Sequence, residues 1–190
     1  MRFAHILSLV LALDSMASAA TLVVSPVSQN VALGSQAVFT VDIAGLGNGV
    51  APSVGVFDFD ILFDPAILSF SGVVFGNQLD ILGLGSIQSA TPGFGSVNLF
   101  ELSLDTVADL NDLQSPAFIL ATLTFDTLAN GVSPITINLN SLGDADGAAI
   151  AATITDGSVE VGQSTVVPEP AYWPLLALGL VTAVRFRKRG

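Results

Sequence analysis

The side chains that could do chemistry in this chain are almost all carboxylates. Of the 16 acidic residues, 14 lie between Thr21 and Val167, because only Asp14 and Glu169 fall outside that stretch. The stretch contains no Lys, Arg, His, Cys, Met, Tyr or Trp. Nucleophilic sites with a histidine base, lysine Schiff bases and Cys/His zinc sites are therefore excluded there. Phosphate and nucleic acid are also excluded as ligands, which leaves paired-acid hydrolysis or the binding of a hard cation.

Asp58 and Asp60 form the clearest acid pair. They stand two positions apart in an alternating segment, so they share one face of a strand at a separation of about 7 Å. That spacing suits glycoside hydrolysis with inversion. Such enzymes usually also hold the sugar with aromatic and basic side chains, and the central stretch has no Trp, Tyr, His or Arg. We therefore interpret the pair as outward-facing acids and predict that the protein is not an enzyme.

Asp144 and Asp146 are the candidate metal ligands. The segment Asp144-Ala145-Asp146-Gly147 matches the first half of a calcium-binding loop, which requires a glutamate six residues after the glycine. That position holds Thr153, so the full motif is absent. Two interpretations stand, an Asp-rich turn and a site for Ca²⁺, the one cofactor that the sequence suggests.

Strict alternation predicts the elements that position these acids. Phe57, Phe59, Ile61 and Phe63 share one face of a strand, and the acids lie on the other. Glycine and proline clusters separate several such segments, and only one helical turn is expected, within residues 104–113. This pattern is typical of an all-β antiparallel sandwich or jelly roll. Further strands are predicted at residues 39–43, 97–104, 117–128, 134–139 and 158–161.

The alternating segments resemble those of cohesin domains. The segment 54–70, in which a strand runs into Phe63-Asp64-Pro65, carries the resemblance together with residues 36–43, 120–125 and 156–161. The resemblance implies a jelly roll of about nine strands over residues 21–162. It also implies a non-enzymatic binding module whose partner is a dockerin-like protein. A carbohydrate-binding module and a purely structural protein of the biofilm matrix remain as alternatives.

Residues 1–20 have the organisation of a secretory signal peptide. Arg2 is followed by an apolar core at residues 6–13 and by small residues before the expected cleavage site. Cleavage between Ala19 and Ala20 fits this pattern, and cleavage before Thr21 fits it equally well. We expect the segment to form a signal helix that directs the chain out of the cytoplasm.

The C-terminal segment has three parts in a fixed order. A linker over residues 163–170 ends in Pro168-Glu169-Pro170, an uncharged apolar run covers residues 171–184, and a basic tail covers residues 185–190. The run would form a helix of about 21 Å, short of a hydrocarbon core of about 30 Å. The basic tail would stay in the cytoplasm, so a membrane helix after an exported domain is predicted.

This order resembles the PEP-CTERM sorting signal. The resemblance implies that an exosortase recognises the motif formed by Pro168, Glu169 and Pro170 and processes the chain near it. The protein would be anchored in the membrane only transiently and would then be extracellular or bound to the cell surface. Exopolysaccharide is a second expected partner, because the family occurs in bacteria that secrete it.

Overall fold

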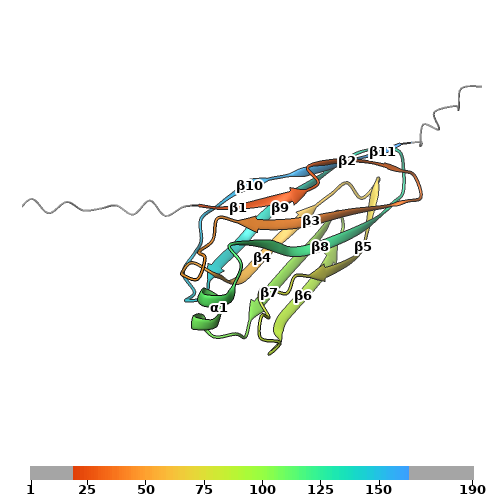
Figure 1. Cartoon of the computed structure of the whole chain (residues 1–190). Coiled ribbons are helices and arrows are strands. Elements are labelled where there is room, and N and C mark those ends of the chain that lie inside the picture. The colour runs from red at the N-terminus through yellow and green to blue at the C-terminus, as the bar shows by residue number, and fades with distance from the viewer. Residues whose placement is uncertain (1–18, 163–190) are drawn as a thin grey trace, which may run out of the picture.

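The computed structural model describes residues 19–162, which form a sandwich of two β-sheets (Figure 1). The predicted signal helix, linker, membrane helix and basic tail lie outside the described residues. Within residues 19–162, no helix is long and apolar enough to cross a membrane. The five-stranded sheet contains, in spatial order, β10 (Ala152–Thr155), β1 (Ala20–Ser25), β3 (Gln36–Ala44), β8 (Ala117–Thr127) and β5 (Leu68–Phe75). The six-stranded sheet contains β2 (Ser28–Ala32), β11 (Gly157–Gly162), β9 (Gly131–Asp144), β4 (Val54–Leu62), β7 (Ser96–Ser103) and β6 (Ser86–Gly93).

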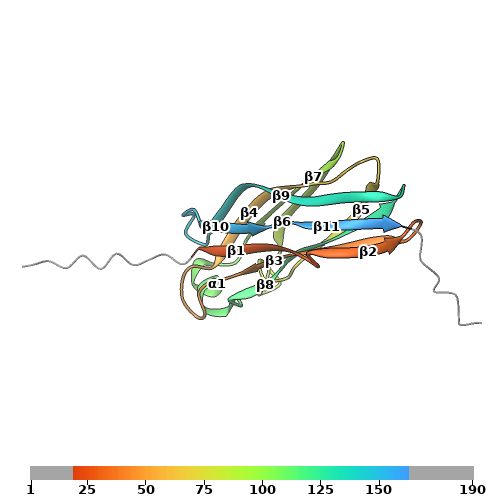
Figure 2. The same cartoon turned by 90° about the horizontal axis from the view of Figure 1, so that it is seen from above.

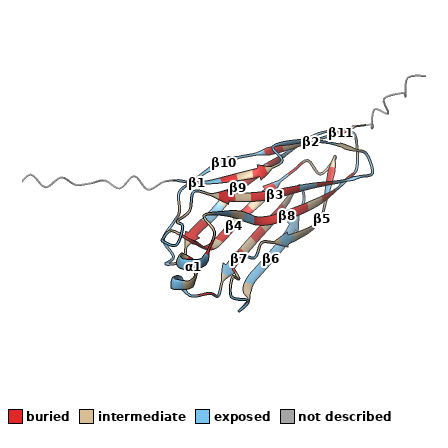
Figure 3. Cartoon of the chain, in the orientation of Figure 1, coloured by how far each residue is buried: buried red, intermediate tan, exposed pale blue. Residues whose placement is uncertain are grey.

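Alternating side chains build the core between the two sheets, as the sequence predicts. Phe57 and Phe59 of β4 are fully buried and stack with their ring centroids 5.0 Å apart. On the opposite sheet, Phe125 of β8 meets Phe39 and Phe63 edge to face. Each buried phenylalanine stabilises the fold by about 1.5–3 kcal/mol through removal of apolar surface from water. Along the central strands, buried residues alternate with residues that are half-buried or exposed (Figure 3).

The structure has eleven strands where about nine were expected, because two runs of chain each contribute one strand to both sheets. β1 and β2 are one run that changes sheet at Pro26, and β10 and β11 are another that changes sheet at Asp156. The two runs lie side by side, so β1 pairs with β10 and β2 pairs with β11 (Figure 2). Both of these pairs are parallel, whereas the prediction of an antiparallel sandwich is right for the other seven pairs.

The single described helix, α1 (Val107–Leu113), confirms the predicted helical turn. The Thr106 hydroxyl caps it by accepting a hydrogen bond from the Asp109 amide. The helix ends at Gln114, whose buried side chain bonds both backbone groups of Val54 and the carbonyl of Gln78. Gln114 thus fixes the start of β4 to the loop that follows β5.

Candidate recognition face on the six-stranded sheet

Asp58 and Asp60 lie on the outer face of the six-stranded sheet, as predicted. Their neighbours Phe57, Phe59 and Ile61 occupy the inner face. The strand register places Asn98 of β7 beside Asp60 on one side, and β9 brings two further asparagines on the other. We refer to this group as the acid–amide cluster; it comprises Asp58, Asp60, Asn98, Asn138 and Asn140.

Amide groups hold both carboxylates of the acid–amide cluster. The Asn98 side-chain amide donates to Oδ1 of Asp58 at 2.7 Å and to Oδ1 of Asp60 at 3.0 Å. Asn140 donates to Oδ1 of Asp58 at 3.1 Å and to Oδ2 of Asp60 at 3.2 Å. Asn138 adds a bond to Oδ2 of Asp60 at 3.3 Å. Two acids on one strand are therefore bridged by neutral donors and need no cation.

These hydrogen bonds lower the pKa of Asp60 below its ordinary value. The bond from Asn98 has the largest effect, burial opposes it, and the bonds from Asn140 and Asn138 add to it. Hydrolysis by paired acids requires one carboxyl group whose pKa is raised, so that it can act as a general acid. The pKa of Asp60 is shifted in the opposite direction. Asp60 is thus suited to presenting fixed negative charge and unsuited to donating a proton.

Apolar side chains flank the acid–amide cluster on the same face. Ile87 of β6 is 51% exposed, Leu62 of β4 is 39% exposed and Leu102 of β7 is 36% exposed. Val56 and Phe100 lie between them and are half-buried. The face therefore presents two negative charges next to exposed apolar side chains, so a partner could combine complementary charge with apolar contact. We call this surface, formed by β9, β4, β7 and β6, the recognition face.

Asp144 is the last residue of β9 and Asp146 lies in the turn that follows, and neither belongs to the acid–amide cluster. Oδ1 of Asp144 accepts hydrogen bonds from the amides of Asp146 and Ala148, at 3.0 and 2.7 Å. Asp144 thus stabilises its own turn, and Asp146 lies beside it in the exposed part of the turn. Among the described residues, no group of three or more His, Cys, Asp or Glu could hold a metal ion. Binding of Ca²⁺ at Asp144 and Asp146 stays a prediction.

The two predicted cleavage residues differ in their surroundings. Ala20 is buried at the start of β1, and its amide donates to the Ala151 carbonyl at 2.9 Å. Ala19 precedes the strand and is exposed. The sorting motif Pro168-Glu169-Pro170 lies outside the described residues.

The three asparagines of the acid–amide cluster were not among the predicted site residues. Asn98 is 40 residues from Asp58 in the chain and Asn140 is 82 residues from it, so only strand pairing brings them together. One signal was available, because Asn138 and Asn140 alternate with apolar residues in the predicted strand at 134–139 and just beyond it. Amides at every second position indicate one polar face of a strand.

Comparison with known proteins gives structural likeness without sequence likeness. No family model matches the chain, and no curated protein matches it. The seventh ScaB type I cohesin from Pseudobacteroides cellulosolvens superposes with a TM-score of 0.62 at 16% identity, covering 79% of this chain and 96% of the cohesin. The sixth cohesin of scaffoldin B from Acetivibrio cellulolyticus, solved in complex with a dockerin, gives 0.60 at 17% identity over 76% and 100%.

A non-cellulosomal cohesin from the archaeon Archaeoglobus fulgidus is similar to the same degree. Its TM-score is 0.59 at 16% identity, and the match covers 79% of this chain and 96% of that one. The sandwich therefore aligns with nearly the full length of these cohesin modules. The described domain has a cohesin-like fold, which confirms the fold that the segment at residues 54–70 suggested.

Proposed function

We propose that this chain is a non-enzymatic binding module that recognises a protein partner through the recognition face. The acid–amide cluster within its apolar surround is the observation that carries the proposal. The Acetivibrio cohesin was solved with a dockerin, which supports a dockerin-like protein as the partner. The partner would present basic or amide side chains to Asp58 and Asp60, and apolar side chains to Ile87 and Leu102.

The module would act outside the cell. The signal peptide over residues 1–20 would export it, and an exosortase would process it at the motif of Pro168, Glu169 and Pro170. The mature domain would then assemble with its partner at the cell surface or in exopolysaccharide. The sequences of the N-terminal and C-terminal segments support export and processing, and the cohesin-like fold supports a binding role.

Isothermal titration against dockerin-bearing proteins encoded in the same genome tests the proposal. We expect saturable binding that the double substitution Asp58→Asn/Asp60→Asn weakens by at least about tenfold, because it removes the charge at the centre of the face. The matched control is Asp42→Asn/Asp126→Asn, which removes two charges from the outer face of the five-stranded sheet. Equal weakening in both variants, or in neither, would contradict recognition through this face.

A further inference from the structure

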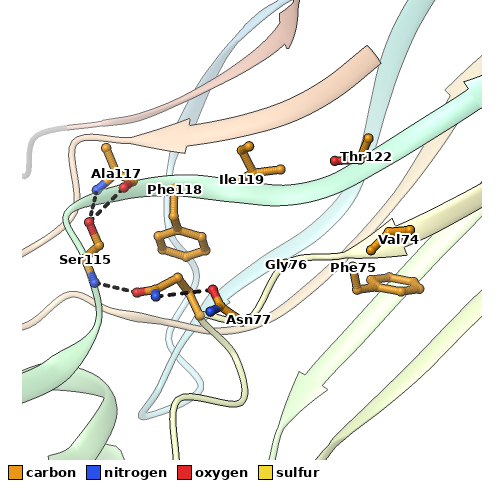
Figure 4. Close-up of a pocket in the computed structure, with 10 residues that line it drawn as sticks. Val74, Phe75, Gly76, Asn77, Ser115, Ala117, Phe118, Ile119 and Thr122 are labelled. Carbon is orange, nitrogen blue, oxygen red and sulfur yellow. Dashed lines mark hydrogen bonds between the residues drawn. The ribbon is translucent and has the colours of Figure 1, made fainter. Parts of the chain in front are cut away.

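A groove lies on the five-stranded sheet, where β5 ends and β8 begins (Figure 4). It is an open groove with a volume of about 590 Å³. Small-molecule sites commonly enclose about 300–1,000 Å³. The groove belongs to the sheet opposite the recognition face, so the two sites are separate. Its lining consists of Val74, Phe75, Gly76, Asn77, Gln78, Ser115, Ala117, Phe118, Ile119 and Thr122.

Gly76 allows the groove to form at this point. Its amide donates to the Leu120 carbonyl at 2.8 Å, which brings the end of β5 against β8. A Cβ at this position would lie 2.0 Å from the Ile119 carbonyl oxygen, so only glycine permits the approach. The Ser115 amide then donates to the Gln78 side chain at 2.8 Å and fixes the far wall. A bond between backbone groups therefore holds one side of the groove, and a bond from a backbone amide to a side chain holds the other.

The lining combines aromatic rings with neutral polar groups. Phe75 and Phe118 are half-buried against the core, and Figure 4 shows their rings on the same side of β8 with Gly76 between them. Asn77, Gln78, Ser115 and Thr122 supply amides and hydroxyls, which both donate and accept hydrogen bonds. Val74 and Ile119 form exposed apolar parts of the wall, with exposed fractions of 71% and 45%.

None of the ten lining residues is charged, although residues 21–167 carry 14 acids. A cationic ligand would have no counter-ion in the groove, and an anionic ligand would meet the repulsion of the whole domain. Ser115 and Gln78 already make hydrogen bonds within the groove wall, whereas the Asn77 side-chain NH2 and the Thr122 hydroxyl have no partner among the described residues. A purely aliphatic ligand would cover these two groups without satisfying them, which is unfavourable. The lining fits a neutral ligand with an apolar face and several hydroxyl groups. Sugar rings have this character, since their C–H faces pack on aromatic rings and their hydroxyls bond to amides.

We infer that the groove binds one or a few residues of a neutral oligosaccharide. The sugar would pack against Phe118 and the aliphatic wall of Val74 and Ile119, and its hydroxyls would bond to Asn77 and Ser115. The domain would then hold a protein partner on one sheet and a polysaccharide on the other. The inference does not depend on the proposed function, because the two sites share no residue.

The test is a titration of the ¹⁵N-labelled full chain followed by amide chemical shifts. The probes are cellohexaose, xylohexaose, mannohexaose and chitohexaose, with an alginate hexamer as the anionic control and n-octanol as the aliphatic control. We expect at least one neutral hexamer to shift the amides of Gly76, Asn77 and Phe118 with a Kd of about 1 mM or below. The alginate hexamer should not shift them, because the domain repels it.

Two substitutions of equal exposure localise the binding. Ile119→Glu places a charge in the groove and should weaken binding at least about tenfold. Val38→Glu changes a residue on the neighbouring β3 that is 44% exposed, close to the 45% of Ile119, and should leave binding unchanged. Asp58→Asn/Asp60→Asn should also leave it unchanged, which separates this result from the test of the recognition face.

Three results would overturn the inference. The first is the absence of a shift in the groove amides with all four neutral hexamers at about 10 mM, a concentration well above that of a millimolar site. The second is equal weakening by Ile119→Glu and Val38→Glu. The third is saturable binding of n-octanol where no hexamer binds, because the groove would then be an aliphatic site.

Discussion

Replacing Glu101 with glutamine should stabilise the domain at neutral pH. Glu101 is fully buried on the inner side of β7. Its Oε1 accepts hydrogen bonds from the Ser86 hydroxyl at 2.7 Å and the Gln88 amide at 2.8 Å. Its Oε2 is buried and has no partner among the described residues. Burial raises the pKa of Glu101 above its ordinary value of 4.5, the two hydrogen bonds oppose this, and the charge of Asp80 adds to it.

The sign of the pH dependence follows from the raised pKa of Glu101. Well below pH 4.5 the carboxyl group is protonated in both the folded and the unfolded chain, and the ionisation of Glu101 does not reduce the stability of the domain. As the pH rises, the unfolded chain releases its proton first, so the free energy of unfolding falls until the pH exceeds the pKa of the folded state. Above that pH, folding keeps a buried carboxylate whose second oxygen lacks a hydrogen bond, at a cost of about 1–3 kcal/mol.

Glu101→Gln keeps the Oε1 acceptor and removes the negative charge. Its NH2 group takes the place of the unpartnered Oε2, so the expected gain comes from the lost charge and not from a new hydrogen bond. At pH 7 we expect the variant to be about 1–3 kcal/mol more stable than the wild type, which is an increase of about 0.5–1.5 M in the urea midpoint. At pH 4 the two should agree within about 0.5 kcal/mol. Far-ultraviolet circular dichroism follows the unfolding, because residues 21–162 contain no Trp or Tyr. The control is Glu160→Gln, which changes the exposed glutamate of β11.

A difference between Glu101→Gln and the wild type that is the same at pH 4 and pH 7 would refute the reasoning. So would a variant that is less stable than the wild type at pH 7. Either result would show that the buried carboxylate is stabilised by its surroundings in the folded state.

Asn98→Ala should raise the pKa of Asp60, measured from its carboxyl ¹³C shift, because the bond from Asn98 is the largest cause that lowers it. The lowered pKa contributes stability that is lost as the pH falls, so the variant should lose less stability on acidification; an unchanged Asp60 titration would contradict this. A chain that begins at Thr21 should be less stable in urea by about 1–2 kcal/mol than one that begins at Ala20, because the buried Ala20 and its hydrogen bond are lost. Equal urea midpoints would show that Ala20 is dispensable. Ca²⁺ should raise the melting temperature through the turn of Asp144, and a shift no larger than that of NaCl at matched ionic strength would exclude such a site.

The central strands could be predicted because each has one buried and one open face. In β4 the inner residues are phenylalanine and isoleucine and the outer ones are acids, so the period of two is visible in the sequence. β6 gives no such signal, since seven of its eight residues are exposed. It lies at the edge of its sheet and is defined by its pairing with β7. Local pattern therefore gives no signal for an edge strand such as β6, which is defined by its neighbour.

The sequence predicted the acids of the candidate site but not the asparagines that bind them. The outward position of Asp58 and Asp60 follows from the burial of their neighbours. The register that adds Asn98 and Asn140 depends on pairing between segments far apart in the chain, including irregularities in β4–β9 pairing. The two parallel pairs were missed for a similar reason. They arise because two neighbouring runs of chain cross from one sheet to the other side by side, near Pro26 and Asp156. No local sequence pattern predicts this crossing.

The hydrogen-bond donors of each carboxylate distinguish the acids that stabilise the fold from the acids that are suited to binding. Residues 21–162 contain no basic side chain, so the carboxylates of the domain depend on neutral donors. Several acids at strand ends and in loops accept backbone amides. Asp64, Asp80 and Asp144 bond to Ala66, Gly85 and Ala148 within their own turns. Asp105 and Asp156 bond to Ile81 and Ile137 in segments distant along the chain. Asp58 and Asp60 instead accept side-chain amides on an open sheet face, where a partner's donors can replace them without moving the backbone. Loss of a loop acid should therefore reduce stability, whereas loss of Asp58 and Asp60 should reduce binding and leave the fold intact.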